Sequence, residues 1–116
     1  MGLFGFGKKK KKEDAYIDFP FDSPPNVAVI TCRHVMDGNK PVLLATHDYD
    51  DYGWQFLCGA AHTMADAMVV GLEEVFYKDA TIAEISKMSP GYGAKREYVG
   101  AHWQVYRMEE DIEQPE

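Results

Sequence analysis

The 116-residue chain lacks the features that define several broad classes of protein. Its two cysteines, Cys32 and Cys58, are too few for a disulfide framework. They indicate buried thiols in a reducing compartment, although a bridge between neighbouring strands stays open as an alternative. No apolar run approaches the roughly 20 residues that a membrane-spanning helix needs, and no apolar signal-peptide segment follows the lysines at positions 8–12. We therefore expect a cytoplasmic protein.

Basic residues are scarce outside the first 14 positions. Residues 1–14 carry five lysines and two acids, whereas the rest of the chain has seven basic and 17 acidic residues. A nucleic-acid-binding domain would need a basic face, so this acidic body argues against nucleic acid as a partner. It suits a basic protein partner, with a homodimer as an open alternative. An acidic surface that serves only solubility is the other alternative.

Recognisable catalytic motifs are also missing. Gly91 and Gly93 lack the third glycine or the Lys-Ser/Thr pair of a phosphate loop. Asp50 and Asp51 are expected on an exposed turn, where solvent keeps both ionised and unfit as a general acid. The cysteines and histidines could form a nucleophile and a base, but no local signature places a pair together. We therefore predict no catalytic residue and no cofactor, and favour a non-enzymatic protein over an enzyme.

Hydrophobic residues make up 46% of the chain, which is ordinary for one globular domain. We predict a Lys-rich flexible segment at residues 1–14, an extended linker at 15–26, a folded domain at 27–108 and an acidic disordered tail at 109–116. We favour a solvated tail for the first of these segments. Weak contact with a membrane surface, through Leu3, Phe4 and Phe6 beside the lysines, is the alternative.

The first half of the domain has the pattern of three strands. Residues 27–32 form a β-branched run, the Asp37-Gly38 pair is typical of a hairpin turn, and residues 41–46 follow as a second strand. Gly53 then precedes residues 54–58, in which Trp54, Phe56 and Cys58 alternate with less buried positions. We expect these three strands to form an antiparallel meander.

The second half contains an ambiguous stretch. Met64, Met68, Leu72 and Val75 share one face of a long helix, but a strand at 67–70 followed by a helix at 72–78 fits equally well. Asp79 is predicted to cap a helix at 81–88, a loop is predicted at 89–93, and a last strand is predicted at 102–108 with Trp103, Val105 and Arg107 inward.

The fold predicted from these elements is an α+β domain. Its antiparallel sheet has four or five strands, and two or three short helices pack on one face. The predicted core comprises Val29, Ile30, Val42, Leu44, Trp54, Phe56, Leu72, Val75, Ile82, Ile85 and Trp103.

The most distinctive segment is the acidic and aromatic turn before Gly53. Tyrosine and tryptophan provide rigid contact area, and carboxylates attract a basic partner. A solvated loop with Trp54 in the core is the alternative. Tyr92, Arg96 and Trp103 form a second contact patch or simply cover the core. The predicted partner-binding residues are Asp48, Tyr49, Asp50, Asp51, Tyr52 and Trp54.

The spacing of cysteine, histidine and aspartate residues bears on two kinds of metal site. Cys32, His34, Cys58 and His62 offer four ligands that suit zinc, but their spacing matches no familiar finger and Cys58 belongs with the core face of its strand. A calcium loop that starts at Asp48 would place Gly59 where a bidentate carboxylate is needed. We therefore predict no metal, and keep a small metal-binding or Cys/His hydrolase-like enzyme as the alternative function.

Four segments carry a resemblance to a known family: the strand at 27–32, the Gly-Asn-Lys-Pro-Val stretch at 38–42, the acidic turn with Gly-Trp at 50–59, and the helix-Asp-helix stretch at 72–85. Together they resemble small bacterial α+β domains of unknown function that are grouped with predicted immunity proteins of polymorphic toxin systems. Relatives often have Asp-Ser before Gly-Trp, where this chain has Asp51-Tyr52, and a proline where it has Ala80. The resemblance implies a fold and a protein-binding role, with a basic toxin domain as the partner, and no active site.

Overall fold

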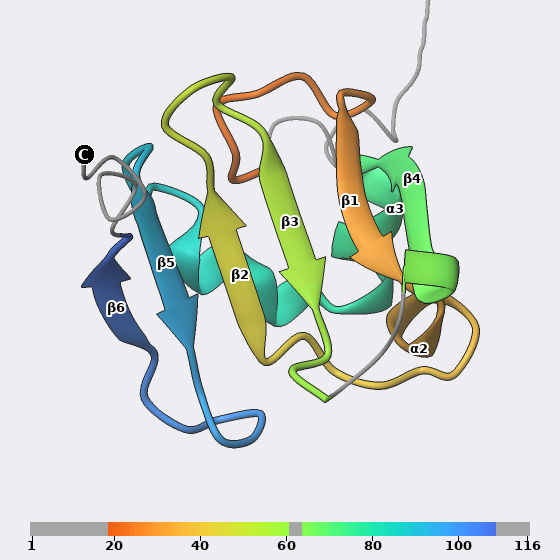
Figure 1. The fold of residues 1–116 in the computed structure, drawn as a ribbon. Coiled ribbons are helices and arrows are strands. Elements are labelled where there is room, and N and C mark those ends of the chain that lie inside the picture. Colours follow the sequence, from red (N-terminus) through yellow and green to blue (C-terminus); the bar gives the residue numbers. More distant parts are fainter. Residues whose placement is uncertain (1–18, 61–63, 109–116) are drawn as a thin grey trace, which may run out of the picture.

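The computed structural model describes residues 19–60 and 64–108. These residues form one α+β domain around a mixed sheet with the strand order β4-β1-β3-β2-β5-β6 (Figure 1). The strands are β1 (Ala28–Cys32), β2 (Leu44–His47), β3 (Trp54–Leu57), β4 (Ala67–Gly71), β5 (Tyr92–Lys95) and β6 (Gln104–Arg107). The helices are α2 (Arg33–Met36), α3 (Leu72–Lys78) and the 3₁₀ helices η2 (Met64–Asp66) and η3 (Ala80–Ile85). The α+β class is confirmed, with six strands instead of four or five.

The predicted meander is wrong in one pairing. β2 and β3 are antiparallel neighbours, but β1 pairs with β3 in parallel instead of with β2. The reason lies after β1, where residues 33–36 form a helical turn. The backbone N–H groups of Asp37 and Gly38 both donate to the Arg33 carbonyl, so this pair ends α2 instead of closing a hairpin. The chain then crosses to the far side of β3 before β2 begins.

The ambiguous stretch resolves into a strand and a helix. β4 pairs antiparallel with β1 along its whole length, and α3 follows at once. The Glu74 carboxylate accepts a hydrogen bond from the Gly71 N–H at 2.9 Å, which caps α3. Asp79 caps the next helix as predicted, because its side chain accepts from the Thr81 N–H at 3.0 Å. That helix is a 3₁₀ helix and ends at Ile85, earlier than expected.

Two expectations for the C-terminal strands are wrong. β5 occupies part of the predicted loop, because the missing side chain at Gly93 makes room for the Tyr106 ring, 2.6 Å from where a Cβ would lie. β6 is an edge strand with all four residues exposed, and Val105 is 55% exposed instead of inward. Trp103 lies just before β6 and packs against the core.

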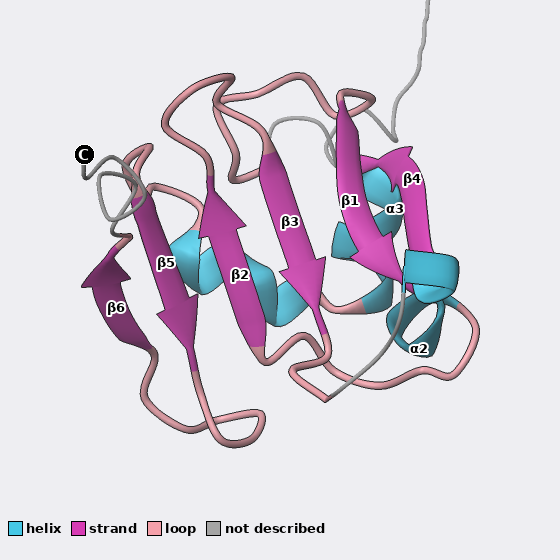
Figure 2. Ribbon diagram, in the orientation of Figure 1, coloured by secondary structure: helices cyan, strands magenta, loops and turns pink. Residues whose placement is uncertain are grey.

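The core lies between the sheet and the helices that cover one of its faces, α3 among them (Figure 2). Most of the predicted core is confirmed as buried: Val29, Val42, Trp54, Phe56, Leu72, Val75, Ile82 and Ile85. Leu44 is half-buried, and the prediction for Ile30 is wrong, since it is 39% exposed on the face without helices. Phe21, predicted in a linker, is buried against Trp54 and Phe56, so the packed chain starts before residue 27.

The predicted N-terminal lysine segment and acidic tail lie outside the described residues. Within the part of the chain that the structure describes, no helix combines the length and apolar character needed to cross a membrane.

Candidate functional site

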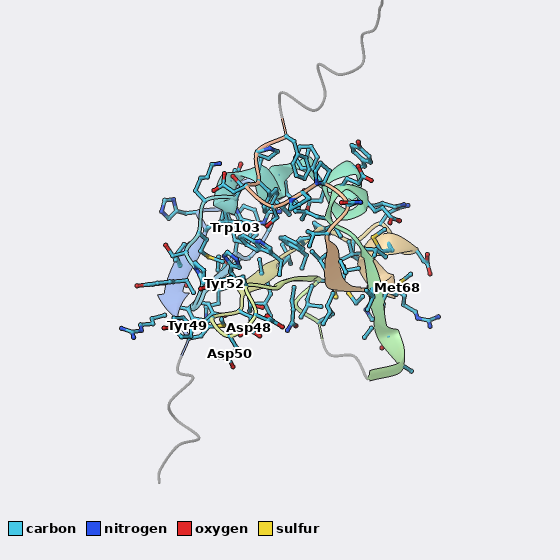
Figure 3. All side chains as sticks on the ribbon, turned by 90° about the horizontal axis from the view of Figure 1, so that it is seen from above. Asp48, Tyr49, Asp50, Tyr52, Met68 and Trp103 are labelled. Carbon is cyan, nitrogen blue, oxygen red and sulfur yellow. The ribbon has the colours of Figure 1, made fainter. Side chains whose placement is uncertain are left out.

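The acidic turn, residues 48–53, joins β2 to β3 at one end of the sheet. Figure 3 shows Asp48, Tyr49, Asp50 and Tyr52 gathered there, far from Met68 on β4. The Asp48 N–H donates to the Gly53 carbonyl at 2.7 Å. Carboxylates hold the rest of the turn, since Asp48 accepts from the Asp50 N–H at 3.1 Å and Asp51 from the Gly53 N–H at 2.8 Å. The turn is thus ordered by its own side chains before any partner arrives.

Two tyrosines project from this turn. Tyr49 is 58% and Tyr52 65% exposed, so more than half of each residue's surface is accessible to solvent. Tyr52 also has a φ of 60°, in the left-handed region that costs a non-glycine residue about 1–2 kcal/mol. The hydrogen bonds of the turn hold that conformation. The fold therefore maintains an unfavourable backbone conformation where a large aromatic side chain is displayed.

Trp54 takes a different role from its neighbours in the predicted contact set. It is only 4% exposed, and its ring stacks on His47 at 4.0 Å and on Phe56 at 5.4 Å between centroids. The prediction that placed it in the core is confirmed. Trp54 also lines the pocket beside the turn, but little of its surface is exposed to a partner. The rest of the predicted set lies in the turn itself, where Asp48 is half-buried and four residues are exposed: Tyr49, Asp50, Asp51 and Tyr52.

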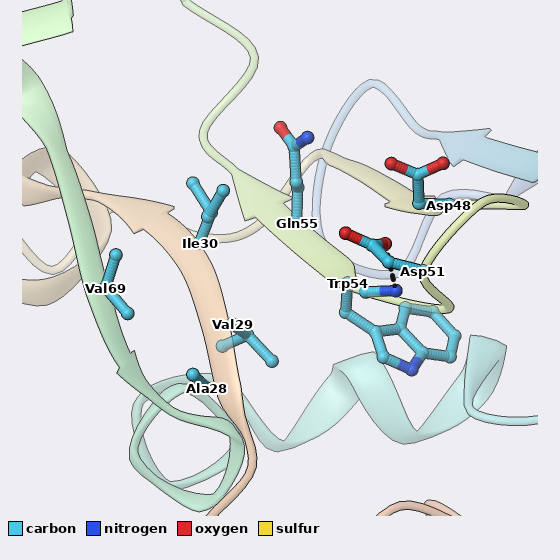
Figure 4. A pocket seen from close by; sticks show the side chains of 9 residues that line it. Ala28, Val29, Ile30, Asp48, Asp51, Trp54, Gln55 and Val69 are labelled. Atoms are coloured by element: carbon cyan, nitrogen blue, oxygen red, sulfur yellow. Dashed lines mark hydrogen bonds between the residues drawn. The ribbon is translucent and has the colours of Figure 1, made fainter.

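A pocket of about 140 Å³ lies beside the turn, on the face of the sheet without helices (Figure 4). Ile30 and Val69 are register partners on β1 and β4 and form an apolar side of it. Asp48 and Asp51 line the opposite side, next to Gln55. The sequence did not reveal this pocket, because it depends on β1 lying next to β3.

A second group of candidate side chains lies at the other end of β3. β1 and β3 run parallel, so their carboxyl ends meet at one edge, a common place for binding sites in α/β proteins. The potential ligand atoms of Cys32, His34 and Cys58 all lie within 4.8 Å of one another, with Cys58 Sγ 3.6 Å from His34 Nδ1. Three of the four possible zinc ligands in the sequence thus come together, and the fourth, His62, lies outside the described residues.

Burial sets the protonation of Cys58. Desolvation, together with the neighbouring Cys32 thiol, raises the pKa of Cys58 above its ordinary value. The thiol is consequently neutral at pH 7 in the absence of a metal, and the imidazole of His34 is next to a thiol instead of a thiolate. This state is unlike that of a catalytic cysteine, whose pKa is lowered.

Alkylation of Cys58 tests this directly. In the Cys32→Ser variant with chelator present, iodoacetamide should modify Cys58 several-fold more slowly at pH 7.5 than it modifies a free cysteine derivative. The thiolate is the reactive form, so a raised pKa lowers the rate at neutral pH and moves its rise to higher pH. Cys58 lines a pocket of about 430 Å³ but is only 7% exposed, so the pH at which the rate rises reports the pKa more directly than the rate itself. A rate at or above that of the free thiol would contradict the raised pKa.

Arg96 is a buried charge that the sequence did not reveal. Its side chain is fully buried, and its guanidinium donates to the Val42 carbonyl, to Thr81 Oγ1 at 2.8 Å and to Asp79 Oδ2 at 3.3 Å. The ring of Trp103 lies 4.2 Å away. Two residues of the predicted second contact patch, Arg96 and Trp103, therefore cover the core. Arginine is seldom buried, so composition gave no signal for this role.

No protein-family model matches the chain, and comparisons with curated proteins and with solved structures found no match either. The resemblance to immunity proteins stays a prediction.

Proposed function

We propose that this protein is a non-enzymatic protein-binding module, and that its acidic turn binds a basic surface of a partner protein. The observation that carries the proposal is the combination of exposed Tyr49 and Tyr52 with a pocket that has carboxylates on one side and apolar residues on the other. Aromatic residues and arginine dominate the energetics of protein interfaces. The turn offers the aromatic half of such a contact and the acids that would receive the arginine.

The pocket specifies one feature of the partner. A volume of about 140 Å³ has room for one long side chain. The aliphatic part of a lysine or arginine would pack on Ile30 and Val69, which is 72% exposed without a partner. Its charged end would reach Asp48 and Asp51, and charge-assisted hydrogen bonds of this kind are stronger than neutral ones. We infer a basic anchor residue in the partner.

The resemblance suggests the biological form of this binding. In an immunity role, the acidic turn would cover the basic active site of a toxin and keep its substrate out. A turn already held by Asp48 and Asp51 suits this task, because little ordering entropy remains to be lost when the partner binds. The acidic body of the chain would accelerate association with such a partner at low salt.

The hydrolase form of the alternative function receives less support. It would need Cys58 as a nucleophile activated by His34, and the two atoms are 3.6 Å apart. The raised pKa of Cys58 opposes this role, because a nucleophilic cysteine must reach the thiolate state near neutral pH. The same three side chains are better suited to a metal than to covalent catalysis.

Charge reversal at Asp50 tests the proposed interface. The turn uses the backbone N–H of Asp50 and not its carboxylate, so Asp50→Lys should leave the fold intact. Full-length protein is used as bait in an extract of its source cells, and captured proteins are quantified by mass spectrometry. We expect a protein that wild type captures to be lost with Asp50→Lys. With that protein purified, Asp50→Lys should slow association roughly tenfold at low salt and reduce its salt dependence.

Glu97→Lys is the matched control. Glu97 is an exposed acid in the connection from β5 to β6, at the end of the sheet opposite the turn, and its reversal changes the net charge equally. A partner lost with both variants would indicate a response to net charge alone. A captured set that is identical for wild type and Asp50→Lys would overturn the role of the acidic turn.

A further inference from the structure

We propose that Cys32, His34 and Cys58 form a binding site for a thiophilic d¹⁰ metal ion, and specifically for Zn²⁺. The ligand atoms of the three residues lie within 4.8 Å of one another, on three separate positions of the fold: the end of β1, the first turn of α2 and the residue after β3. Zinc prefers these ligand types, thiolate sulfur and imidazole nitrogen, in a tetrahedral arrangement.

The spacing of the ligand atoms agrees with zinc coordination. With Zn–S near 2.3 Å and Zn–N near 2.0–2.1 Å, two tetrahedral ligands are separated by about 3.6 Å. Cys58 Sγ and His34 Nδ1 are 3.6 Å apart. The distances from Cys32 Sγ to the other two ligand atoms are each within 4.8 Å. Rotation of the Cys32 side chain would shorten them. Thiol and imidazole in ordinary contact can show this distance too, so the third ligand is what distinguishes a metal site from a simple hydrogen bond.

Charge balance also favours the ion. Cys32 is completely buried and Cys58 nearly so, and buried thiolates need a compensating charge. Two thiolates and one neutral imidazole around Zn²⁺ give a site of zero net charge. Binding would release two protons to solvent, one from each thiol, because the metal binds the deprotonated form. No counter-ion from elsewhere in the protein is required.

The fourth coordination position would face a pocket. His34 and Cys58 line a space of about 430 Å³ together with Lys40, Pro41, Leu43 and Ala60. Three protein ligands with an accessible fourth position are typical of zinc sites that hold a water or an external ligand. This site is at the opposite end of β3 from the acidic turn, so it is independent of the proposed protein interface.

Metal titration tests the site. Full-length protein is freed of metal with a chelator, kept reduced with a phosphine and titrated with Co²⁺ as a spectroscopic substitute for zinc. We expect one equivalent to bind, with intense visible bands of tetrahedral cobalt and sulfur-to-cobalt charge transfer. Zn²⁺ should displace the cobalt, release about two protons per ion and raise the melting temperature. Both cysteines should then be protected from alkylation.

Variants separate coordination from general effects. Cys58→Ser should lose the charge-transfer band and the one-equivalent end point, and His34→Ala, at a half-buried position, should weaken cobalt binding while circular dichroism shows an intact fold. His102→Gln is the control, because His102 is exposed and outside the group. The proposal is overturned if the reduced wild type binds no cobalt, or if Cys58→Ser binds it as tightly as wild type and the His102→Gln control do.

Discussion

Replacing Arg96 with alanine should lower the free energy of unfolding by about 3–5 kcal/mol, because the change leaves a nearly buried carboxylate without its cation. The Asp79 side chain is 9% exposed and accepts hydrogen bonds from the backbone N–H groups of Val42 and Thr81 as well as from Arg96. Arg96 also donates to the Val42 carbonyl and lies against the Trp103 ring. Its loss disconnects β5 from the start of η3.

Urea denaturation followed by circular dichroism measures this effect. Lys87→Ala is the matched control, because it breaks an ion pair with Asp22 in which both side chains are largely exposed. Exposed pairs contribute about 0–1 kcal/mol, so the control should unfold close to wild type. Arg96→Lys keeps the charge but loses the planar set of donors, and we expect it to fall between the two. An Arg96→Ala variant as stable as Lys87→Ala would show that the buried network contributes little.

Local patterns predicted the parts of the fold that depend on neighbouring residues. Alternation placed Trp54, Phe56 and Cys58 on the buried side of β3, and Asp79 was recognisable as a helix cap because its side chain bonds two residues ahead. The acidic turn also lies where its composition indicated. Each of these features is fixed by contacts within a few residues, which a single sequence displays.

Such local patterns could not predict which strands pair across the sheet. Asp37-Gly38 carries the chemistry of a hairpin turn, and nothing nearby shows that residues 33–36 coil into a helical turn first. The pairing of β1 with β3 therefore could not be predicted, and two consequences followed from it. It moves Cys32 next to Cys58, whereas an intervening strand would separate them by about two strand spacings, or 9–10 Å. It also creates the pocket beside Asp51.

Replacing Trp54 with alanine is the second large effect that we expect, a loss of about 3–5 kcal/mol in the free energy of unfolding. The ring is 4% exposed and contacts three aromatic neighbours: His47, Phe56 and, edge-on at 5.2 Å, Phe21. Its removal would leave a cavity beneath the acidic turn and separate the residue 19–21 segment from the sheet. Denaturant unfolding measures the loss, and Tyr49→Ala, a 58% exposed aromatic, is the control with little expected change.

Trp54→Phe then distinguishes a core residue from a contact residue. Phenylalanine keeps an aromatic ring between His47 and Phe56, so this variant should retain most of the stability. Because Trp54 is buried, the folded Trp54→Phe protein should capture the same partner as wild type, whereas Tyr52→Ala should capture less, since the Tyr52 ring is 65% exposed. If Trp54→Phe stayed folded but lost the partner while Tyr52→Ala kept it, the contact surface would have to be placed on the strand and not on the turn.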